Sequence, residues 1–325
     1  MNVAFMFPGT NSQRAGMGRD LYLRHRLARE LYEQANDAAG FDLARISFSE
    51  PPGCLAPVSY SQPAILAHSV VLMELMKEAG ILPVAACGHS LGEFAALVAA
   101  GVIAFPQAIR LVYRRARLIE AHFRPGRGSM MAVTGASAES VARWCQLASG
   151  KGVVEIANHN GPRQIVVSGE HGALREVERL AMTSGGCQCT GLPVRYPFHT
   201  RLMKGVEILL AAELSQVQFN DARIPVASNS DGSAVTSGAA WRELLLKQLS
   251  GAVRWDRTVD SAIAYGVSCF VELGPGRILQ GLIRRMAAVE TLGAQGCQSL
   301  GEAVRRLHSL MADRTPGSAA GKAGA

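Results

Sequence analysis

The chain has 325 residues, of which 48% are hydrophobic, and it carries a formal net charge of +7. Its length permits a large core and more than one domain, while a charged fraction of 18% and 34 glycines are typical of a compact α/β enzyme and exclude a disordered or coiled-coil chain. Lys and Arg form no run interleaved with aromatic residues, so we expect no binding of nucleic acid.

Hydrophobic periodicity predicts strands that alternate with helices along the chain. Before residue 128 the expected elements are strand 2–7, helix 63–79 with Pro63 in its first turn, strand 84–87, helix 91–100 and helix 106–122. The next segment predicts strand 129–134, helix 137–148, strands 153–157 and 164–168, helix 171–184 and strand 187–194. The last segment predicts helix 201–214, strand 224–228, helices 238–249 and 256–265, strand 267–272 and helix 277–287.

The order of these elements predicts an α/β fold with two domains. Strands that alternate with helices indicate a mainly parallel sheet, which we assign to a larger domain built from residues 1–127 and 194–312. Residues 128–193 have the order βαββαβ, which is the split ferredoxin-like arrangement, and we expect them to form a small inserted domain. The small, polar residues of 313–325 predict a disordered tail.

Residues 88–92 read Gly-His-Ser-Leu-Gly between two apolar runs. In a strand–turn–helix setting this G-x-S-x-G pattern lifts the Ser hydroxyl above the sheet, so Ser90 is a candidate nucleophile. The N-terminus of helix 91–100 would aim free N–H groups at the same space, where they would stabilise an oxyanion, and the turn at residues 8–10 could add a second donor. Glu93 completes an S-x-x-E pattern, which we interpret as a helix-capping box.

A Ser hydroxyl becomes a useful nucleophile only when a base takes its proton. Among the eight histidines, His199 lies in a loop between a strand end and a helix start, where catalytic groups often occur. His89 is expected to point away from Ser90. Because the sequence shows no acid placed to orient His199, a backbone carbonyl could be the acceptor for its ring.

Helix 106–122 would direct Arg115 into the middle of its apolar face, which runs through Leu111, Val112 and Ile119. A guanidinium in the core is costly unless an anion meets it. The anion could be a buried Asp or Glu in a structural pair, or the carboxylate of a substrate held by two parallel hydrogen bonds. The sequence pattern alone leaves both interpretations open.

Charge, cysteines and hydropathy bear on location and partners. The seven cysteines are odd in number and lack paired spacing, which indicates free thiols in a reducing compartment and favours packing over metal binding. The first nine residues lack the features of a signal peptide, and the apolar run 94–104 is too short to span a membrane. We therefore expect a cytoplasmic protein without a metal site. The basic charge suits an acidic partner, although solvated charge explains it equally well.

Several stretches, in order along residues 2 to about 310, match the pattern of one family: F-P-G-T-N-S-Q near the start, S-Q-P-A at 61–64, G-H-S-L-G-E at 88–93, V-Y-R-R-A-R at 112–117, N-H-N-G-P-R-Q at 158–164, Y-P-F-H at 196–199, K-Q-L at 247–249 and E-L-G-P-G at 272–276. The chain resembles the malonyl-CoA:acyl carrier protein transacylases, including the acyltransferase domains of polyketide synthases. The resemblance implies an α/β-hydrolase-like domain with an inserted ferredoxin-like domain.

The resemblance also implies roles for the residues that match the family's motifs. These are Ser90 as nucleophile, His199 as general base, Arg115 as partner of the malonyl carboxylate, Leu91 and Thr10 as backbone oxyanion donors, Gln248 as the residue whose main-chain carbonyl region orients the His, and Gln62 and Asn160 as residues lining the pocket. No bound cofactor is implied, since the CoA thioester is itself the substrate.

The chain departs from the family pattern at three places. Thr10-Asn11 stands where the family usually has Gln-Gly, which changes the size and polarity of the pocket while leaving a backbone donor. Phe198 precedes the His, as it often does in malonyl-selective polyketide domains, and its ring would crowd a methyl branch on the acyl group. The run Ser-Gly-Ala-Val-Arg-Trp at 250–255 replaces an N-P-V-R-W-like run, and its effect is not evident from the sequence.

We therefore expect a free-standing acyltransferase that moves a malonyl group from CoA to an acidic acyl carrier protein through a Ser-linked acyl-enzyme. One alternative is a hydrolase that clears acyl groups from carrier proteins, which the change at Thr10-Asn11 keeps open. Another is a transferase of a non-malonyl group between carriers, and a third is a catalytically weak docking module. A lipase-type esterase is the least expected, because its pocket has no use for an inward Arg115.

Overall fold

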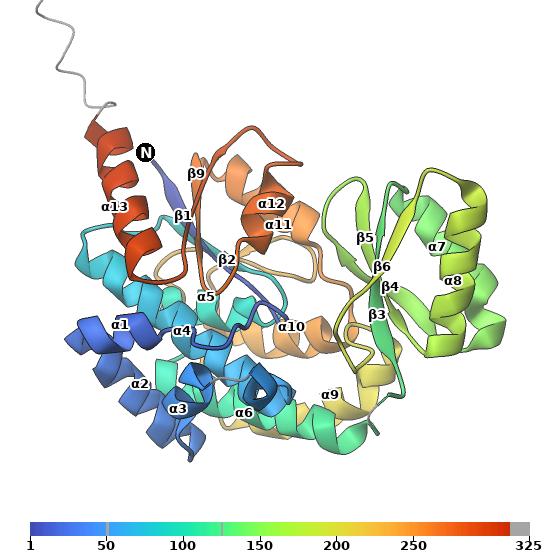
Figure 1. Cartoon of the computed structure of the whole chain (residues 1–325), viewed down its shortest axis with the longest axis horizontal. Coiled ribbons are helices and arrows are strands. Elements are labelled where there is room, and N and C mark those ends of the chain that lie inside the picture. Colours follow the sequence, from blue (N-terminus) through green and yellow to red (C-terminus); the bar gives the residue numbers. More distant parts are fainter. Residues whose placement is uncertain (50–51, 125, 313–325) are drawn as a thin grey trace, which may run out of the picture.

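A six-stranded sheet forms the centre of the larger part of the molecule (Figure 1). The computed structural model describes residues 1–49, 52–124 and 126–312. The strand order is β10-β9-β1-β2-β7-β8, and all neighbouring pairs are parallel except β7 with β8. The strands are β1 (Val3–Phe7), β2 (Ala85–Gly88), β7 (Val226–Ala227), β8 (Ala234–Val235), β9 (Cys269–Leu273) and β10 (Glu290–Ala294).

Helices cover both faces of this sheet. Successive residues of a strand point to opposite sides, and β1 is buried along its whole length, so both faces need a covering layer. The helices are α1 (Arg19–Arg24), α2 (Arg26–Ala39), α3 (Leu43–Phe48), α4 (Val58–Glu78), α5 (Gly92–Ala99), α6 (Phe105–His122), α9 (Lys204–Ser215), α10 (Gly238–Ser250), α11 (Trp255–Ala264), α12 (Ile278–Ile283) and α13 (Cys297–Ala312), with short 3-10 helices η1 (Pro52–Leu55) and η3 (Arg201–Met203). Ala4 and Met6 pack with residues of α11 and α12, whereas Phe5 and Phe7 belong to the larger core that includes α4.

A second, antiparallel sheet with the strand order β4-β5-β3-β6 forms a smaller unit beside the first (Figure 1). Its elements are β3 (Ser129–Thr134), α7 (Ala138–Ala148), η2 (Ser149–Lys151), β4 (Val154–His159), β5 (Gln164–Gly169), α8 (His171–Ser184) and β6 (Gln188–Gly191). Met131 and Val133 pack under α7 and α8. Met130 and Ala132 alternate with them and line the cavity that contains Ser90, so the other face of this sheet closes one side of the site.

A short stretch of backbone pairing joins β4 of the smaller sheet to the segment between α10 and α11. Val253, which lies between α10 and α11, forms a parallel bridge with Asn158 of β4. The Val253 N–H donates to the Ala157 carbonyl and the Val253 carbonyl accepts from the His159 N–H, both at 2.8 Å. The run 250–255 thus ties the smaller sheet to the segment that follows α10.

The structure confirms the α/β class and the mainly parallel sheet, and it corrects several expected boundaries. Helix α4 begins at Val58, so Pro63 lies inside the helix rather than in its first turn. Helix α12 ends at Ile283, four residues before the predicted end at 287. The sequence patterns did not predict α1, α2, α3, β8, β10 and α13. The expected disordered tail, 313–325, lies outside the described residues, and within them no helix combines the length and apolar character needed to cross a membrane.

Candidate active site

Ser90 stands at the tight turn between β2 and α5, with a left-handed backbone φ of 52°. The glycines on either side allow close approach of the backbone. A Cβ on Gly88 would lie 2.0 Å from the carbonyl carbon of Gly92, and a Cβ on Gly92 would lie 2.0 Å from the carbonyl oxygen of Phe7. Any side chain at either position would therefore push the strand, the turn and the helix apart.

The Ser90 hydroxyl contacts His199, with 2.7 Å between Oγ and Nε2. The other ring nitrogen, Nδ1, lies 2.8 Å from the carbonyl oxygen of Gln248. Because a carbonyl oxygen only accepts, Nδ1 carries the proton and Nε2 is left to accept from the Ser90 hydroxyl. Burial lowers the pKa of His199 to about 3, and the nearby positive charge of Arg115 adds to the effect, so the ring is neutral near pH 7.

Asn229 holds the turn from the neighbouring strand, and the sequence analysis did not single it out. It follows β7, which pairs with β2 in the sheet. Its Oδ1 accepts from the Ser90 N–H and its Nδ2 donates to the Gly88 carbonyl, both at 2.7 Å. The available signal was a polar side chain directly after a strand, at the edge of the sheet where the Ser turn also lies.

The interpretation of Glu93 as part of a capping box is wrong. Helix α5 has Leu91 as its N-cap, and the Ser90 N–H is taken by Asn229 instead of by Glu93. The Glu93 carboxyl accepts from the Asn229 N–H at 2.7 Å and from Gln248 Nε2 at 2.9 Å. Ser90 could not serve as a typical cap, because its left-handed φ lies outside the extended region that N-cap residues adopt.

Arg115 points into the interior, as the helical periodicity predicted, and is 2% exposed. Its Nη1 donates to Gln62 Oε1 at 2.9 Å, and its guanidinium carbon lies 5.8 Å from the centre of the Phe94 ring. Among the described residues it forms no ion pair, so the structural-pair interpretation finds no support. Burial lowers its pKa to about 10 although the charge of Glu93 opposes this, and the guanidinium stays positive at neutral pH.

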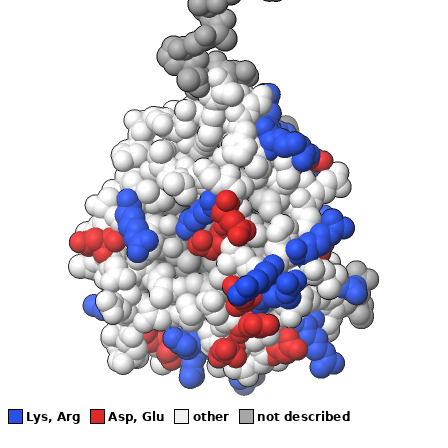
Figure 2. Space-filling view, turned by 90° about the vertical axis from the view of Figure 1, so that its left-hand side faces the viewer, with Lys and Arg blue, Asp and Glu red and all other residues white. Residues whose placement is uncertain are grey.

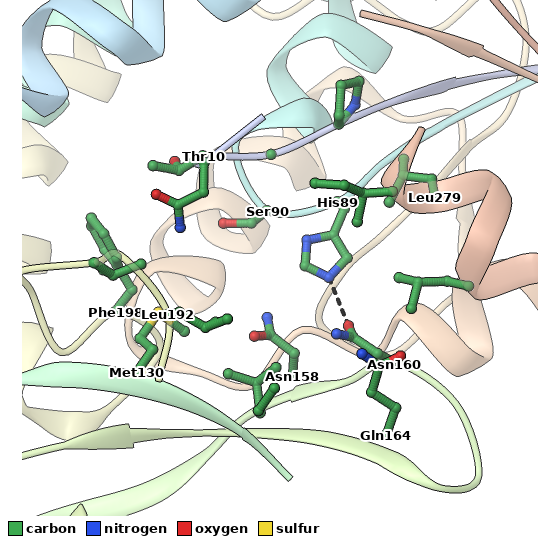
Figure 3. Close-up of a pocket in the computed structure, with 18 of the residues that line it drawn as sticks. Thr10, His89, Ser90, Met130, Asn158, Asn160, Gln164, Leu192, Phe198 and Leu279 are labelled. Atoms are coloured by element: carbon green, nitrogen blue, oxygen red, sulfur yellow. Dashed lines mark hydrogen bonds between the residues drawn. The ribbon is translucent and has the colours of Figure 1, made fainter. Parts of the chain in front are cut away.

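A cavity of about 200 Å³ opens above Ser90, between the ends of β1 and β2 and the smaller sheet (Figure 3). Four of the predicted site residues line it: Thr10, Ser90, Asn160 and Phe198. The other five do not line it, although His199 contacts the hydroxyl of Ser90 from beside the floor: Gln62, Leu91, Arg115, His199 and Gln248. The link from Arg115 to the cavity runs through Gln62, whose Nε2 donates to the Thr10 hydroxyl oxygen at 3.4 Å.

His89 turns its ring away from Ser90, as expected, and its Nε2 lies 2.8 Å from Asn160 Oδ1 (Figure 3). This contact fixes the Asn160 amide on the wall opposite Thr10. A second cavity of about 520 Å³ shares Thr10 and Asn11 with the first and reaches Glu120 of α6. Within the described part of the chain, the N–H groups of Leu91 and Thr10 donate no hydrogen bond, which leaves both available to a bound group.

Comparison with known proteins shows to which family the chain is similar. The model of the acyl transferase domain family matches residues 4–318. The malonyl CoA-acyl carrier protein transacylase of Escherichia coli strain K12 is 37% identical over 292 residues, which cover 90% of this chain and 94% of that protein. The protein of the same name from Bacillus subtilis strain 168 is 36% identical over 285 residues, 87% of this chain and 90% of that protein.

Solved structures with the same architecture include enzymes of this kind. A malonyl-transacylase in complex with its type II polyketide synthase acyl-carrier protein has a TM-score of 0.91 and 35% identity, and covers 94% of this chain and 100% of that chain. The malonyl CoA-acyl carrier protein transacylase of Clostridium perfringens has a TM-score of 0.92 and 30% identity, and covers 96% of this chain and 99% of that chain.

The close approach at the turn predicts that Gly92→Ala lowers the free energy of unfolding by about 3 kcal/mol, because the new methyl group meets the Phe7 backbone. The matched control is Gly281→Ala in α12, where a Cβ meets nothing within 4 Å. This control should leave stability unchanged or raise it by up to about 1 kcal/mol. Urea unfolding followed by circular dichroism measures both, and equal stability of the two variants would contradict the described turn.

Proposed function

We propose, from the premise that this chain belongs to the acyl transferase domain family, that it moves a malonyl group from CoA to the phosphopantetheine thiol of an acyl carrier protein. The observation that carries the proposal is the hydrogen bond of 2.7 Å between Ser90 and a neutral, buried His199 at the floor of a cavity. Behind this cavity lies Arg115, a buried cation that forms no ion pair among the described residues. A diacid half-thioester brings the missing anion.

In the first half-reaction, His199 Nε2 takes the hydroxyl proton while Ser90 Oγ attacks the thioester carbonyl carbon. The N–H groups of Leu91 and Thr10 stabilise the oxyanion of the tetrahedral intermediate. The carbon–sulfur bond then breaks, and the proton on His199 passes to the departing CoA thiolate. The products are the malonyl ester of Ser90 and free CoA, and the ring is neutral again.

In the second half-reaction, the phosphopantetheine thiol gives its proton to His199 Nε2 and attacks the ester carbonyl carbon. The same two N–H groups hold the second oxyanion. The bond from carbon to Ser90 Oγ breaks, and His199 returns the proton to the hydroxyl. The Gln248 carbonyl accepts from Nδ1 throughout and keeps Nε2 directed at the reacting atoms.

Arg115 selects the acyl group by pairing with its free carboxylate. In the unliganded arrangement the guanidinium donates to the neutral amide oxygen of Gln62, which stands between Arg115 and the cavity wall at Thr10. This contact uses one of the five N–H donors of the guanidinium, and the others can pair with the carboxylate. Phe198, which is nearly buried and lines the cavity, crowds the carbon between the two carbonyl groups and favours malonyl over methylmalonyl.

The proposed division of the molecule is a catalytic domain of residues 1–127 and 194–312 with an α/β-hydrolase-like arrangement, and an inserted domain of residues 128–193. The element order βαββαβ and the antiparallel strand order β4-β5-β3-β6 support a ferredoxin-like fold for the inserted domain. Asn160, held by His89, would then bring a polar group of this domain to the thioester side of the cavity.

The carrier protein is expected to approach the mouth of this cavity, because its thiol must reach Ser90. Figure 2 shows the side of the molecule that carries α1, α2 and α13, away from the smaller sheet, and there Lys and Arg side chains lie interspersed with Asp and Glu. The net charge of +7 nevertheless favours association with an acidic carrier at long range. A cytoplasmic location remains a prediction from the sequence.

Incubation with malonyl-CoA should add one malonyl group to Ser90, and a phosphopantetheinylated carrier protein should then remove it and become loaded. Intact-protein mass spectrometry of both proteins measures this, with Ser90→Ala as the control that gains no mass. The alternative is hydrolysis, which the change at Thr10-Asn11 keeps open, since these two residues border both cavities. Rapid release of free malonate without a loaded carrier would support the hydrolase.

Arg115→Ala should lower kcat/KM for malonyl-CoA about 100- to 1000-fold, because the substrate carboxylate would lose its buried partner. The rate with acetyl-CoA, which has no carboxylate, should stay within a few-fold of its original value. Arg117→Ala, on the exposed side of the same helix, is the matched control and should change neither rate. Equal losses with both substrates would argue against selection by Arg115, and no loss would favour transfer of a non-malonyl group.

The rate of Ser90 acylation should remain constant from pH 7 to pH 5. A free imidazole with a pKa near 6.5 would become protonated in this range and cease to act as a base. Burial lowers the pKa of His199 to about 3, so the folded ring stays neutral, and Glu93, whose pKa burial raises to about 8, keeps one protonation state throughout. Rapid-quench measurements at saturating malonyl-CoA give this rate at each pH. A fall in the rate with a midpoint near pH 6.5 would contradict the lowered pKa of His199.

A further inference from the structure

Glu93 is a buried acid that the proposed reaction does not use. It is 1% exposed, does not line the cavity, and has both carboxyl oxygens bound to N–H groups of the protein. Its carboxyl accepts from the Asn229 N–H and from Gln248 Nε2, and these two residues belong to segments more than 130 positions further along the chain. A buried carboxyl group is costly, which calls for an explanation beyond packing.

One partner of this carboxyl holds the nucleophile. The Asn229 side chain binds the Ser90 N–H and the Gly88 carbonyl, both at 2.7 Å, and so spans the turn from its strand side. With its own backbone N–H bound to Glu93, Asn229 cannot shift without breaking a buried hydrogen bond of 2.7 Å. The left-handed φ of Ser90 is thereby maintained against relaxation.

The other partner holds the base. Gln248 accepts from His199 Nδ1 with its main-chain carbonyl, while its side-chain Nε2 donates both to the Ser90 carbonyl and to Glu93 Oε2. The amide orientation that serves these two acceptors leaves Gln248 Oε1 buried, with no hydrogen-bond partner among the residues that the structure describes. An unsatisfied buried oxygen indicates that the orientation is set by the contacts of Nε2 and not by the amide's own best hydrogen bonding.

We infer that Glu93 is a positioning residue, whose carboxyl joins the segment carrying Ser90 to the segment carrying the acceptor of His199 and so fixes the distance between nucleophile and base. This inference rests on the proposed Ser90 and His199 roles. In this inference the Glu93 carboxyl orients Ser90 through Asn229 and His199 through Gln248, and it does not contact the imidazole ring.

Glu93→Gln keeps the shape of the side chain and replaces one oxygen with an NH₂ group. Either orientation of the new amide sets a donor against a donor, since both positions now accept from N–H groups. The first-turnover rate of Ser90 acylation should fall about 10- to 100-fold with little change in KM, because the cavity wall is untouched. Reaction of Ser90 with a fluorophosphonate, followed by mass spectrometry, should slow by a similar factor.

Glu272→Gln is the matched control. Glu272 is also buried, and it accepts from two backbone N–H groups and a Gln side chain at the start of α12. One of these donors, Leu279, lines the cavity, so Glu272 supports the wall of the site but binds neither the Ser90 turn nor the acceptor of His199. Its loss should lower the unfolding temperature as much as the loss of Glu93 does, yet leave the saturating acylation rate within about threefold. Equal acylation rates for the two variants would overturn the inference, because burial alone would then explain Glu93.

A double-mutant comparison tests the route of the effect. Gln248→Ala removes the side chain but keeps the carbonyl that faces His199, and combined with Glu93→Gln it should slow acylation by less than the product of the two single losses. A combined loss equal to that product would overturn the inference. If Glu93→Gln does not fold, the same comparison between Asn229→Ala and Gln248→Ala, which leave the carboxyl in place, decides in its stead.

The fluorophosphonate reaction separates this inference from the proposed function. An unaltered chain that reacts with the fluorophosphonate but transfers no malonyl group would refute the malonyl transfer, while slow labelling of Glu93→Gln would still support the positioning role. An unaltered chain that transfers malonyl, together with a Glu93→Gln variant that labels and transfers at the same rates, would refute the positioning role alone.

Discussion

The left-handed turn at Ser90 is the constraint on which the site depends. Such a conformation costs an ordinary residue roughly 1–2 kcal/mol, so the surrounding structure must prevent its relaxation. Gly88 and Gly92 let strand, turn and helix approach within contact distance. Asn229 and Gln248 then bind the N–H and the carbonyl of the turn from two other segments. Only this arrangement brings the hydroxyl to the ring of His199.

A buried carboxyl group and a buried guanidinium lie near this turn, and in the described part of the chain they form no direct ion pair with each other. Glu93 is surrounded by N–H donors, and Arg115 is capped by the neutral amide oxygen of Gln62. Each raises or lowers the pKa of the other through space in the direction that favours the charged forms, although burial is the larger effect for both. A guanidinium left with a neutral acceptor keeps its affinity for an anion, which a direct contact with Glu93 would have consumed.

The local patterns of the sequence were sufficient for the parts of the site that depend on neighbouring residues. The pentapeptide around Ser90 predicted the turn, and the helical period predicted that Arg115 points inward. The contacts of Glu93 were not predictable in this way, because they join residues 136 and 155 positions apart. The carboxyl accepts from the Asn229 N–H and therefore does not cap the helix. The position of Pro63 was likewise not predictable from local rules, which place a proline in the first turn, because the buried helix α4 continues through it.

The carbonyl of Gln248 occupies the place where many hydrolases have an acid beside the imidazole. A carbonyl dipole cannot neutralise an imidazolium, and burial with the nearby Arg115 makes that cation still less stable. The ring is therefore a weak base and, once protonated, a strong acid that quickly gives its proton to a departing thiolate. A thiolate leaves with little assistance, so a ring of this kind suffices for exchange among activated thioesters.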